Sequence, residues 1–477
     1  MKRRDFVQKS LCAAVSSAAF TSLATKMSLA HAATPQLILG GGDYRALVCL
    51  YMYGGNDCFN MLVPRDASHW ATYNATRGAL AIPQAQLLSL SPDVAASDGA
   101  LYGMHPSMPE LRALFNQADS PVALIANAGP LLYPITKTQY QNESVPVPPQ
   151  LFSHSDQTVF WQTPSSDAIG RQGWGGRLAD LTTVAGQNPT LSMNVSLDGE
   201  NVFEAGQNVV PYFISPYGVE GIQMDSADTW PPGQQARRTV FNALLNANLV
   251  NPLERAYAAQ MKRTINSYGQ FSTALGLPLN APMEARFNYA INAGGDIIDS
   301  LGGQLRMVAR LMNQRASLGM VRQIFFVGIG GFDTHQTQLT DHANLMRSVS
   351  RGLSAFYQAT VDMGLQDSVT AFTASEFGRT LSGNAGVGTD HGWGGHQIVV
   401  GGAVQGRRYY GNFPSLLANN NPDDAGWGQM IPTTSVDQYA WTLARWYGLQ
   451  AGDRDTVFPN VSRFGAVNQH HLGFLGA

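Results

Sequence analysis

The chain has 477 residues, with 30 basic and 33 acidic side chains and a net charge of −3 at pH 7. This near-neutral balance argues against binding to a phosphate backbone, which requires a strongly basic surface. The length is ample for a large hydrophobic core, and three cysteines do not support a disulfide framework. Composition therefore excludes a nucleic-acid-binding protein that relies on charge and a small disulfide-stabilised scaffold.

Residues 1–32 have the pattern of an export signal. The basic start "MKRRDFVQKS" precedes a weakly apolar segment rich in Ala and Ser, and "AHA" at 30–32 matches a signal-peptidase site. The adjacent Arg3 and Arg4 are typical of a twin-arginine (Tat) signal. An uncleaved anchor helix is the alternative, but Ser and Thr interrupt the run, and a span needs about 18 apolar residues. We predict export through the Tat machinery to the periplasm or the medium.

The remainder, residues 33–477, is predicted to be an acidic protein without a stable membrane span. It carries 25 basic and 32 acidic side chains, a net charge of −7, so nucleic acid is not an expected partner. No further run is long enough to cross a bilayer. Cys49 and Cys58 lie on and just after one predicted strand, too far apart to bridge, and we expect two buried thiols.

Apolar runs that end in small residues alternate with helical patterns along the chain. Because strands that alternate with helices form βαβ units, we predict an α/β fold with a mostly parallel central sheet and helices on both faces. The expected strands are 46–53, 120–129, 321–331, 367–378 and 396–404, and the expected helices are 105–117, 285–314, 341–365 and 435–449.

Two segments depart from this alternation. Residues 130–150 contain five prolines and are expected to form an irregular loop at the edge of the sheet. Residues from about 182 to 280 lose the strand–helix rhythm and are expected to be an insertion with short strands. We therefore predict one α/β domain, residues 33–477, with an insertion at about 182–280.

Polar side chains that can bind metal ions follow the predicted strand ends. The carboxyl ends of parallel strands meet at one edge of a sheet, so these side chains are expected to converge there. Mixed carboxylate and imidazole ligands suit Zn²⁺, with Mg²⁺, Mn²⁺ or Ca²⁺ as alternatives, and one or two ions. The candidate ligands are Asp57, Asp333, His335, Glu376, Asp390, His391 and His396.

Each of these groups has a simpler explanation on its own. Asp57 after an Asn can serve a turn, and Asp333 can cap the helix that follows it. Glu376 and Arg379, three residues apart, can form an ordinary ion pair. The segment "DHGWGGH", which holds His391, is harder to explain in this way, because its glycines allow close backbone approach to an ion. The combination is more specific than any single member.

Several of these motifs together resemble a known family. They are "LYMYGGNDCFNMLVP", "QGWGGRLAD", "GGFDTH", "SEFGRT", "GTDHGWGGH" and "TLARWYG", and they are spread along nearly all of residues 33–477. In these motifs the chain resembles the domain of unknown function 1501 family of exported bacterial proteins. That family is in turn similar to the alkaline phosphatase and sulfatase superfamily, whose members cleave phosphate or sulfate esters with one or two bound metals. The resemblance therefore implies a three-layer, alkaline-phosphatase-like fold.

The resemblance also implies roles for individual residues. Asp57 resembles the first metal aspartate of the superfamily, and Asp333 and His335 resemble its later Asp and His, which are commonly four rather than two positions apart. The next Asp-His pair has two possible counterparts, so either Glu376 or Asp390 supplies the carboxylate, with His391 and His396 as imidazole ligands.

The nucleophile and the anion-binding arginine are less strongly marked. The superfamily places a Ser, Thr or modified Cys at a helix N-terminus, and Ser153 or Ser155 in "LFSHSDQ" would start such a helix, with Ser153 as the candidate nucleophile. A plain N-cap is the alternative for Ser153. Cys58 lacks the Cys-x-Pro-x-Arg pattern of a sulfatase. Arg379, or Arg171 and Arg177, could grip an anionic oxygen, and Arg379 is the candidate catalytic arginine.

These observations lead to an expected function with one main alternative. The expectation is an exported, metal-dependent hydrolase of an anionic ester, in which Ser153 attacks or, failing that, a hydroxide attacks directly. The alternative is a non-catalytic envelope protein that keeps the fold and binds a metal or an anionic partner. A metal-dependent transferase is a third reading of the same scaffold.

Overall fold

The computed structural model describes residues 37–39, 43–164, 172–221 and 233–476. The expected export signal, 1–32, lies outside these residues, so it stays a prediction. Among the helices that are described, none combines the length and the apolarity that a membrane span requires.

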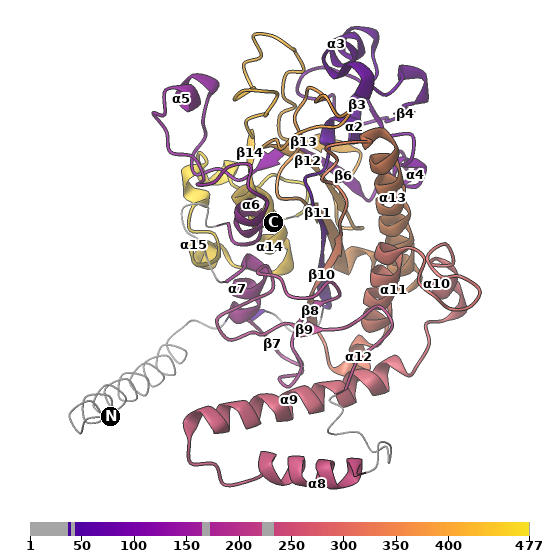
Figure 1. Cartoon of the computed structure of the whole chain (residues 1–477), viewed down its shortest axis with the longest axis vertical. Helices are drawn as coiled ribbons and strands as arrows, with labels where there is room; N and C mark the ends of the chain where they lie inside the picture. Colours follow the sequence, from indigo (N-terminus) through magenta and orange to yellow (C-terminus); the bar gives the residue numbers. More distant parts are fainter. Residues whose placement is uncertain (1–36, 40–42, 165–171, 222–232, 477) are drawn as a thin grey trace, which may run out of the picture.

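A nine-stranded sheet forms the centre of the molecule (Figure 1). Only β12 among the described strands of this sheet runs antiparallel to its neighbours, so the predicted mostly parallel α/β sheet is confirmed. The strand order is β13 (Arg408–Tyr410), β6 (Val122–Gly129), β12 (Gly395–Val400), β11 (Val369–Ala374), β2 (Arg45–Met52), β10 (Arg322–Ile329), β8 (Asn194–Ser196) and β9 (Tyr212–Phe213), and β14 (Thr434–Ser435) pairs with β6.

Two small sheets flank the central one. In the first, β1 (Leu37–Leu39) runs parallel to β7 (Thr182–Val184). In the second, β5 (Tyr102–Met104) lies between β3 (Leu62–Pro64) and β4 (Leu88–Ser89) and is antiparallel to both.

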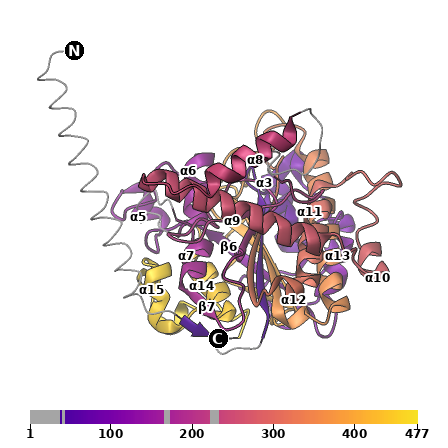
Figure 2. The same cartoon turned by 90° about the horizontal axis from the view of Figure 1, so that it is seen from below.

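Helices cover both faces of the central sheet, which gives three layers (Figures 1 and 2). One face carries α4 (Pro109–Phe115), α11 (Ser300–Asn313) and α13 (Gln338–Asp362), and the other carries α6 (His154–Gln162), α7 (Trp174–Leu181), α14 (Val436–Tyr447) and α15 (Arg454–Val457). Shorter or peripheral helices are α2 (Cys58–Met61), α3 (Ala67–Arg77), α5 (Lys137–Gln141), α8 (Gln234–Leu245), α9 (Pro252–Leu275), α10 (Ala281–Ala285) and α12 (Arg315–Leu318).

Local sequence explains most element boundaries. All residues of β2 except its first are buried, as expected for a central strand covered on both faces. Ser435 and Gln438 form a capping box that starts α14. The expected helix over 285–314 begins only at Ser300, because Gly295 has a φ of +90° and Asp299 caps the new start.

The two segments that were expected to depart from the strand–helix alternation both contain regular elements. Residues 130–150 include the short helix α5. Residues 182–280 add β8 and β9 to the sheet beside β10, while α8 and α9 lie together at one end of the molecule (Figure 1). Whether this segment is an insertion stays a prediction.

Cys49 and Cys58 are both free and buried, as expected.

The register of the sheet brings several strand ends to one level. Ile329 at the end of β10 pairs with Met52 of β2, and Ala374 at the end of β11 pairs with Tyr51. Because β12 is antiparallel, its first residue, Gly395, lies at this same edge. The segments 53–57, 330–335, 375–379 and 390–394 therefore emerge side by side.

Gly54 shows how closely these segments pack. It has a φ of +116°, and a Cβ atom at this position would lie 2.2 Å from the backbone nitrogen of Asp333. Only glycine allows the segments after β2 and β10 to approach this closely.

The buried Glu204 provides a test of the packing beside β8. Burial raises the pKa of this carboxyl from 4.5 to about 8, although Asn201 donates a hydrogen bond to it. The unfolded chain then releases the proton at lower pH than the folded chain, so the free energy of unfolding should fall as pH rises from about 4.5 to about 8. Glu204→Gln should flatten this dependence, by at most about 1.4 kcal/mol per pH unit, in urea titrations at a series of pH values.

The exposed Glu200 supplies the control for this measurement. Glu200→Gln should keep the wild-type pH dependence. An equally steep fall in Glu204→Gln would contradict the assignment to Glu204.

Candidate metal centre

Three imidazoles and one carboxylate meet at the carboxyl edge of the sheet. Asp333 and His335 follow β10, His391 precedes β12, and His154 is the first residue of α6. The Nε2 atom of His391 lies 3.0 Å from Nε2 of His154 and 3.1 Å from Nε2 of His335. The Asp333 carboxylate lies 3.0 Å from His335 Nε2, 3.3 Å from His391 Nε2 and 3.5 Å from His154 Nε2. We call these four residues the His–Asp cluster.

The other nitrogen of each imidazole, Nδ1, faces an oxygen that can only accept a hydrogen bond. A carboxylate or a carbonyl in this position places the proton on Nδ1 and leaves the lone pair of Nε2 facing the cluster. The distances are 2.8 Å from His154 to Glu376 Oε1, 2.9 Å from His335 to Asp390 Oδ1 and 2.7 Å from His391 to the Phe152 carbonyl.

This arrangement fits a divalent cation. Nitrogen lone pairs that face one another across 3.0 Å repel unless a proton or a cation lies between them. Two ligands about 2.0–2.1 Å from a tetrahedral Zn²⁺ are about 3.3 Å apart, close to the separations found here. The ligand atoms of His154, Asp333 and His391 lie within 4.8 Å of one another. Three imidazoles with one carboxylate favour a first-row metal such as Zn²⁺ over Mg²⁺ or Ca²⁺.

A buried arginine supports the carboxylate of the cluster. Arg379 Nη1 donates to Asp333 Oδ1 at 2.7 Å and to the Gly54 carbonyl at 3.0 Å. Its Nε and Nη2 donate to Thr389, to the hydroxyl at 3.2 Å and to the carbonyl. The guanidinium is buried, whereas the Asp333 side chain is 45% exposed. Arg379 therefore holds Asp333 from the interior of the protein, while the other side of the carboxylate stays accessible.

Local electrostatics keep Asp333 and the neighbouring Asp390 charged. Burial alone would raise the pKa of Asp333, but the hydrogen bond and charge of Arg379 and the neighbouring imidazoles hold this pKa below its usual value. The hydrogen bond from Asn384 lowers the pKa of Asp390. The hydrogen bond to Glu376 raises the pKa of His154, and burial lowers the pKa of His391.

Comparison with known families bears on the whole chain. The family model described as "Protein of unknown function (DUF1501)" matches residues 44–433. The chain belongs to the DUF1501 family. The resemblance in the sequence motifs is thereby confirmed. A search of curated proteins finds no match to this chain.

Solved structures show only a distant likeness to this DUF1501 protein. Ps i-CgsB in complex with k-i-k-neocarrahexaose is 9% identical with a TM-score of 0.34, over 89% of this chain and 77% of that chain. The lipoteichoic acid synthase LtaP from Listeria monocytogenes is 8% identical with a TM-score of 0.32, over 86% of this chain and 74% of that chain. Similarity at this level supports no conclusion about function.

The structure brings together three of the ligands expected from the sequence. Asp333, His335 and His391 belong to the His–Asp cluster. Glu376 and Asp390, the two alternatives for one carboxylate ligand, instead accept from the Nδ1 atoms of His154 and His335. Each carboxylate therefore orients an imidazole.

Two expected ligands lie outside the cluster. Asp57 is fully buried, and its Oδ2 accepts hydrogen bonds from Arg77 Nη2 and Gln338 Nε2. His396 is also buried; its Nδ1 accepts from the backbone of Asn127 at 3.0 Å, and burial lowers its pKa to about 3. Both residues have partners within the protein core, so one ion fits the described residues better than two.

Four further residues complete the comparison with the sequence analysis. Ser153 occupies the N-cap position of α6 next to His154 but makes no side-chain capping bond, and its hydroxyl donates to Asp156 Oδ2 at 2.6 Å. Arg379 is enclosed beneath Asp333, which argues against direct contact with substrate. Arg177 donates to the carbonyls of Gln172 and Val457, and Arg171 lies outside the described residues.

His154 is the cluster residue that sequence reasoning missed. It stands in "LFSHSDQ", beside the expected nucleophile Ser153, and follows an irregular segment rather than a strand. The only signal in the sequence was a histidine at the start of a helix. Its partner Glu376 is 222 positions away, so the contact becomes visible only in the folded chain.

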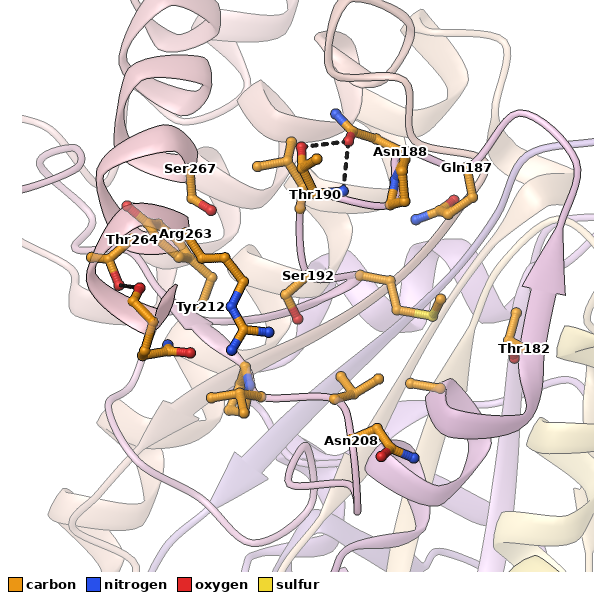
Figure 3. A pocket seen from close by; sticks show the side chains of 18 of the residues that line it. Thr182, Gln187, Asn188, Thr190, Ser192, Asn208, Tyr212, Arg263, Thr264 and Ser267 are labelled. Atoms are coloured by element: carbon orange, nitrogen blue, oxygen red, sulfur yellow. Dashed lines mark hydrogen bonds between the residues drawn. The ribbon is translucent and has the colours of Figure 1, made fainter. Parts of the chain in front are cut away.

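A hollow of about 570 Å³ adjoins the cluster. Its wall includes Asp390, the partner of His335, and the segments 380–384 and 424–429. A second hollow of about 390 Å³ lies at the amino ends of β8 and β9, against α9, with Arg263 as its one charged side chain (Figure 3). The cluster lies at the carboxyl ends of the strands, so the second hollow is separate from it.

Asp390 tests whether the anchoring carboxylates act on a metal. Asp390→Asn removes the charge that orients His335 while leaving a similar shape. Loss of such a partner typically weakens metal binding about 10- to 100-fold, and competition with a chromogenic chelator should measure this. Asp93→Asn, a change in a carboxylate paired with Arg407, is the control. Equal affinities in both variants would contradict the metal centre.

Asp57 tests the distinction between a structural and a ligand carboxylate. Asp57→Asn leaves the buried Arg77 guanidinium without its countercharge, which typically costs about 3–5 kcal/mol of unfolding free energy. Metal content per folded molecule should stay at the wild-type level, as measured by elemental analysis of the purified protein. Asp455→Asn, at an exposed pair with Arg454, should change stability little. Loss of metal in Asp57→Asn would restore Asp57 as a ligand.

Proposed function

We propose that the protein is an exported, metal-dependent hydrolase of phosphate or sulfate esters. The observation that carries this proposal is the convergence of three Nε2 atoms and the Asp333 carboxylate at an accessible edge of the sheet. The side chains of the cluster are between 25% and 45% exposed, so an anionic ester can reach them. The hollow beside Asp390 provides room for the remainder of such a substrate.

His154, His335, His391 and Asp333 would hold the ion. When bound, a divalent cation at this position supplies Lewis-acid polarisation of an ester oxygen and charge stabilisation in the transition state. The protein supplies orientation: Glu376 and Asp390 fix two of the imidazole rings, and Arg379 fixes Asp333. Preorganised charges of this kind need little rearrangement during the reaction.

Ser153 is the candidate nucleophile of this proposal. It is adjacent to His154, and it leaves the first-turn N–H groups of α6 without a side-chain cap, which favours an anionic oxygen at that point. In the covalent route, Ser153 Oγ bonds to phosphorus or sulfur, Asp156 receives its proton, and the alcohol leaves as an alkoxide that takes a proton from solvent. Water then attacks the phosphorus or sulfur atom and loses a proton to solvent, the bond to Ser153 Oγ breaks, Asp156 returns its proton to that oxygen, and the inorganic anion leaves. In the direct route, water attacks without Ser153.

The twin-arginine pattern of residues 1–32 supports export in a folded state. Because the Tat route carries folded proteins, the ion could be loaded before export. The location proposed for the active protein is therefore the periplasm or the medium.

The test is a hydrolysis assay with matched variants. Purified protein of known metal content should hydrolyse at least one of a panel of phosphate monoesters, phosphodiesters and sulfate esters. Chelation should abolish turnover, and a divalent metal should restore it. His391→Ala should lower kcat/KM by at least about 100-fold, whereas His69→Ala, which changes a half-exposed histidine paired with Asp66, should not. Ser153→Ala separates the routes, because only the covalent route requires it.

The same assay addresses the second candidate, a non-catalytic metal or anion binder. The hydrogen bond from Ser153 to Asp156 favours this candidate, because it engages the hydroxyl within its own helix. Bound metal without turnover of any ester, together with anion binding in calorimetry, would replace the hydrolase proposal with the binder.

A further inference from the structure

Trp427 stands out among the exposed side chains. It is 90% exposed, the highest value for a large hydrophobic residue in the described part of the chain. Its backbone has a φ of +61°, in the left-handed region that bulky residues rarely adopt. Both features cost free energy, and backbone strain of this kind is concentrated at functional sites and ligand clamps.

The loop that carries Trp427 is well ordered by its own hydrogen bonds. Asp424 Oδ1 accepts from the backbone nitrogens of Gly426 at 2.9 Å and Gly428 at 3.0 Å. Ala425 N donates to the Gln429 carbonyl at 3.0 Å, and Gln429 N donates to the Gly426 carbonyl at 3.1 Å. The indole is therefore presented by a closed turn, residues 424–430, and its exposure does not result from a loose end.

This turn is attached directly to the metal centre. Gln429 Nε2 donates to the carbonyl of His391 at 3.1 Å. Leu381 N, two residues after Arg379, donates to the Gly428 carbonyl at 2.8 Å. The backbone that carries Trp427 is thus joined to the segments that carry His391 and Arg379.

The indole lies at a hollow that reaches Asp390, the carboxylate that accepts from His335 of the cluster at 2.9 Å. Trp427 and Asp390 both line this hollow of about 570 Å³, a volume within the usual range for ligand sites. Its other polar lining groups include Ser382, Asp424 and Gln429. These offer a hydroxyl, a carboxylate and an amide, which can both donate and accept hydrogen bonds.

We propose that this hollow is a sugar-binding subsite, in which Trp427 stacks on the ring that carries the ester. This inference rests on the proposed hydrolase function. A pyranose ring has an apolar C–H face and a rim of hydroxyl groups. The electron-rich face of an indole can pack against the C–H face, and the polar groups around the indole can form hydrogen bonds with the hydroxyl groups. A flat aromatic group would use the indole but would make no hydrogen bonds with the polar lining.

The experiment compares esters that differ only in the group attached to the anion. The probes are a pyranose sulfate and phosphate, methyl sulfate and phosphate without a ring, and phenyl sulfate and phosphate with a flat aromatic ring. Trp427→Ala is compared with Trp427→Phe, which keeps a ring, and with Tyr217→Ala, which removes an aromatic side chain that is 72% exposed elsewhere. Thermal unfolding and gel filtration verify that each variant is folded and unchanged in size.

Trp427→Ala should lower the kcat/KM ratio of pyranose to methyl ester about tenfold, equivalent to about 1.4 kcal/mol. The change should fall mainly on KM, because contacts to the non-reacting part of a substrate bind ground state and transition state alike. Trp427→Phe should lose less, and Tyr217→Ala should match the wild type. Saturation-transfer NMR with the pyranose sulfate should show transfer to the ring C–H protons, lost in Trp427→Ala.

Several outcomes would overturn the subsite. They are an unchanged ratio, a larger effect on phenyl than on pyranose esters, and a change in oligomeric state with the ratio unaltered. The NMR readout separates this inference from the hydrolase proposal. Sugar binding that depends on Trp427, without turnover of any ester, would contradict only the hydrolase proposal. Hydrolysis of methyl esters without sugar binding would contradict only the subsite proposal.

Discussion

The buried guanidinium of Arg379 is the constraint on which the site depends. It follows β11 and donates to the Gly54 carbonyl after β2, to Asp333 after β10 and to Thr389 before β12. A buried charge needs compensation by countercharge and hydrogen bonds, and these partners supply it. One cation therefore joins the four segments that carry the polar groups of the sheet edge. Burial lowers its pKa, but an arginine keeps its proton in proteins.

The imidazoles of the cluster are also held by hydrogen bonds to distant segments, but they lie at the surface. Each ring is fixed by an oxygen from a different part of the chain, and two of these oxygens belong to carboxylates. Fixed rings present their Nε2 lone pairs before any ion arrives, which lowers the reorganisation that binding requires. The cluster itself is small and half-exposed. In the function proposed here, selection of the group attached to the anion depends on surrounding turns such as residues 424–430.

Two buried arginines, Arg77 and Arg379, each pair with an aspartate, but the two aspartates differ in exposure. Arg77 and Asp57 are both fully buried, and Oδ2 of Asp57 accepts from Arg77 and Gln338. Arg379 is buried as well, but its partner Asp333 is 45% exposed and faces three imidazoles. The two ion pairs therefore differ in the exposure of the carboxylate, which is accessible in Asp333 and enclosed in Asp57.

The sequence by itself determined the α/β class, the strand ends and three of the four cluster residues. Apolar runs that stop at glycines, followed by Asp333, His335 and His391, are local patterns, and parallel strands place their carboxyl ends together. The sequence could not separate Asp57 from Asp333, because both follow a Gly-Gly turn. Only the fold brings Arg77 of α3 onto Asp57.

The tertiary structure also placed His154 in the cluster and Glu376 as the acceptor for its Nδ1. Their contact joins residues 222 positions apart, and it depends on how α6 packs beside the end of β11. The antiparallel direction of β12 is a property of pairing rather than of composition, yet it determines that His391 reaches the cluster. Local sequence patterns place polar groups at strand ends, whereas tertiary packing determines which of these groups come into contact.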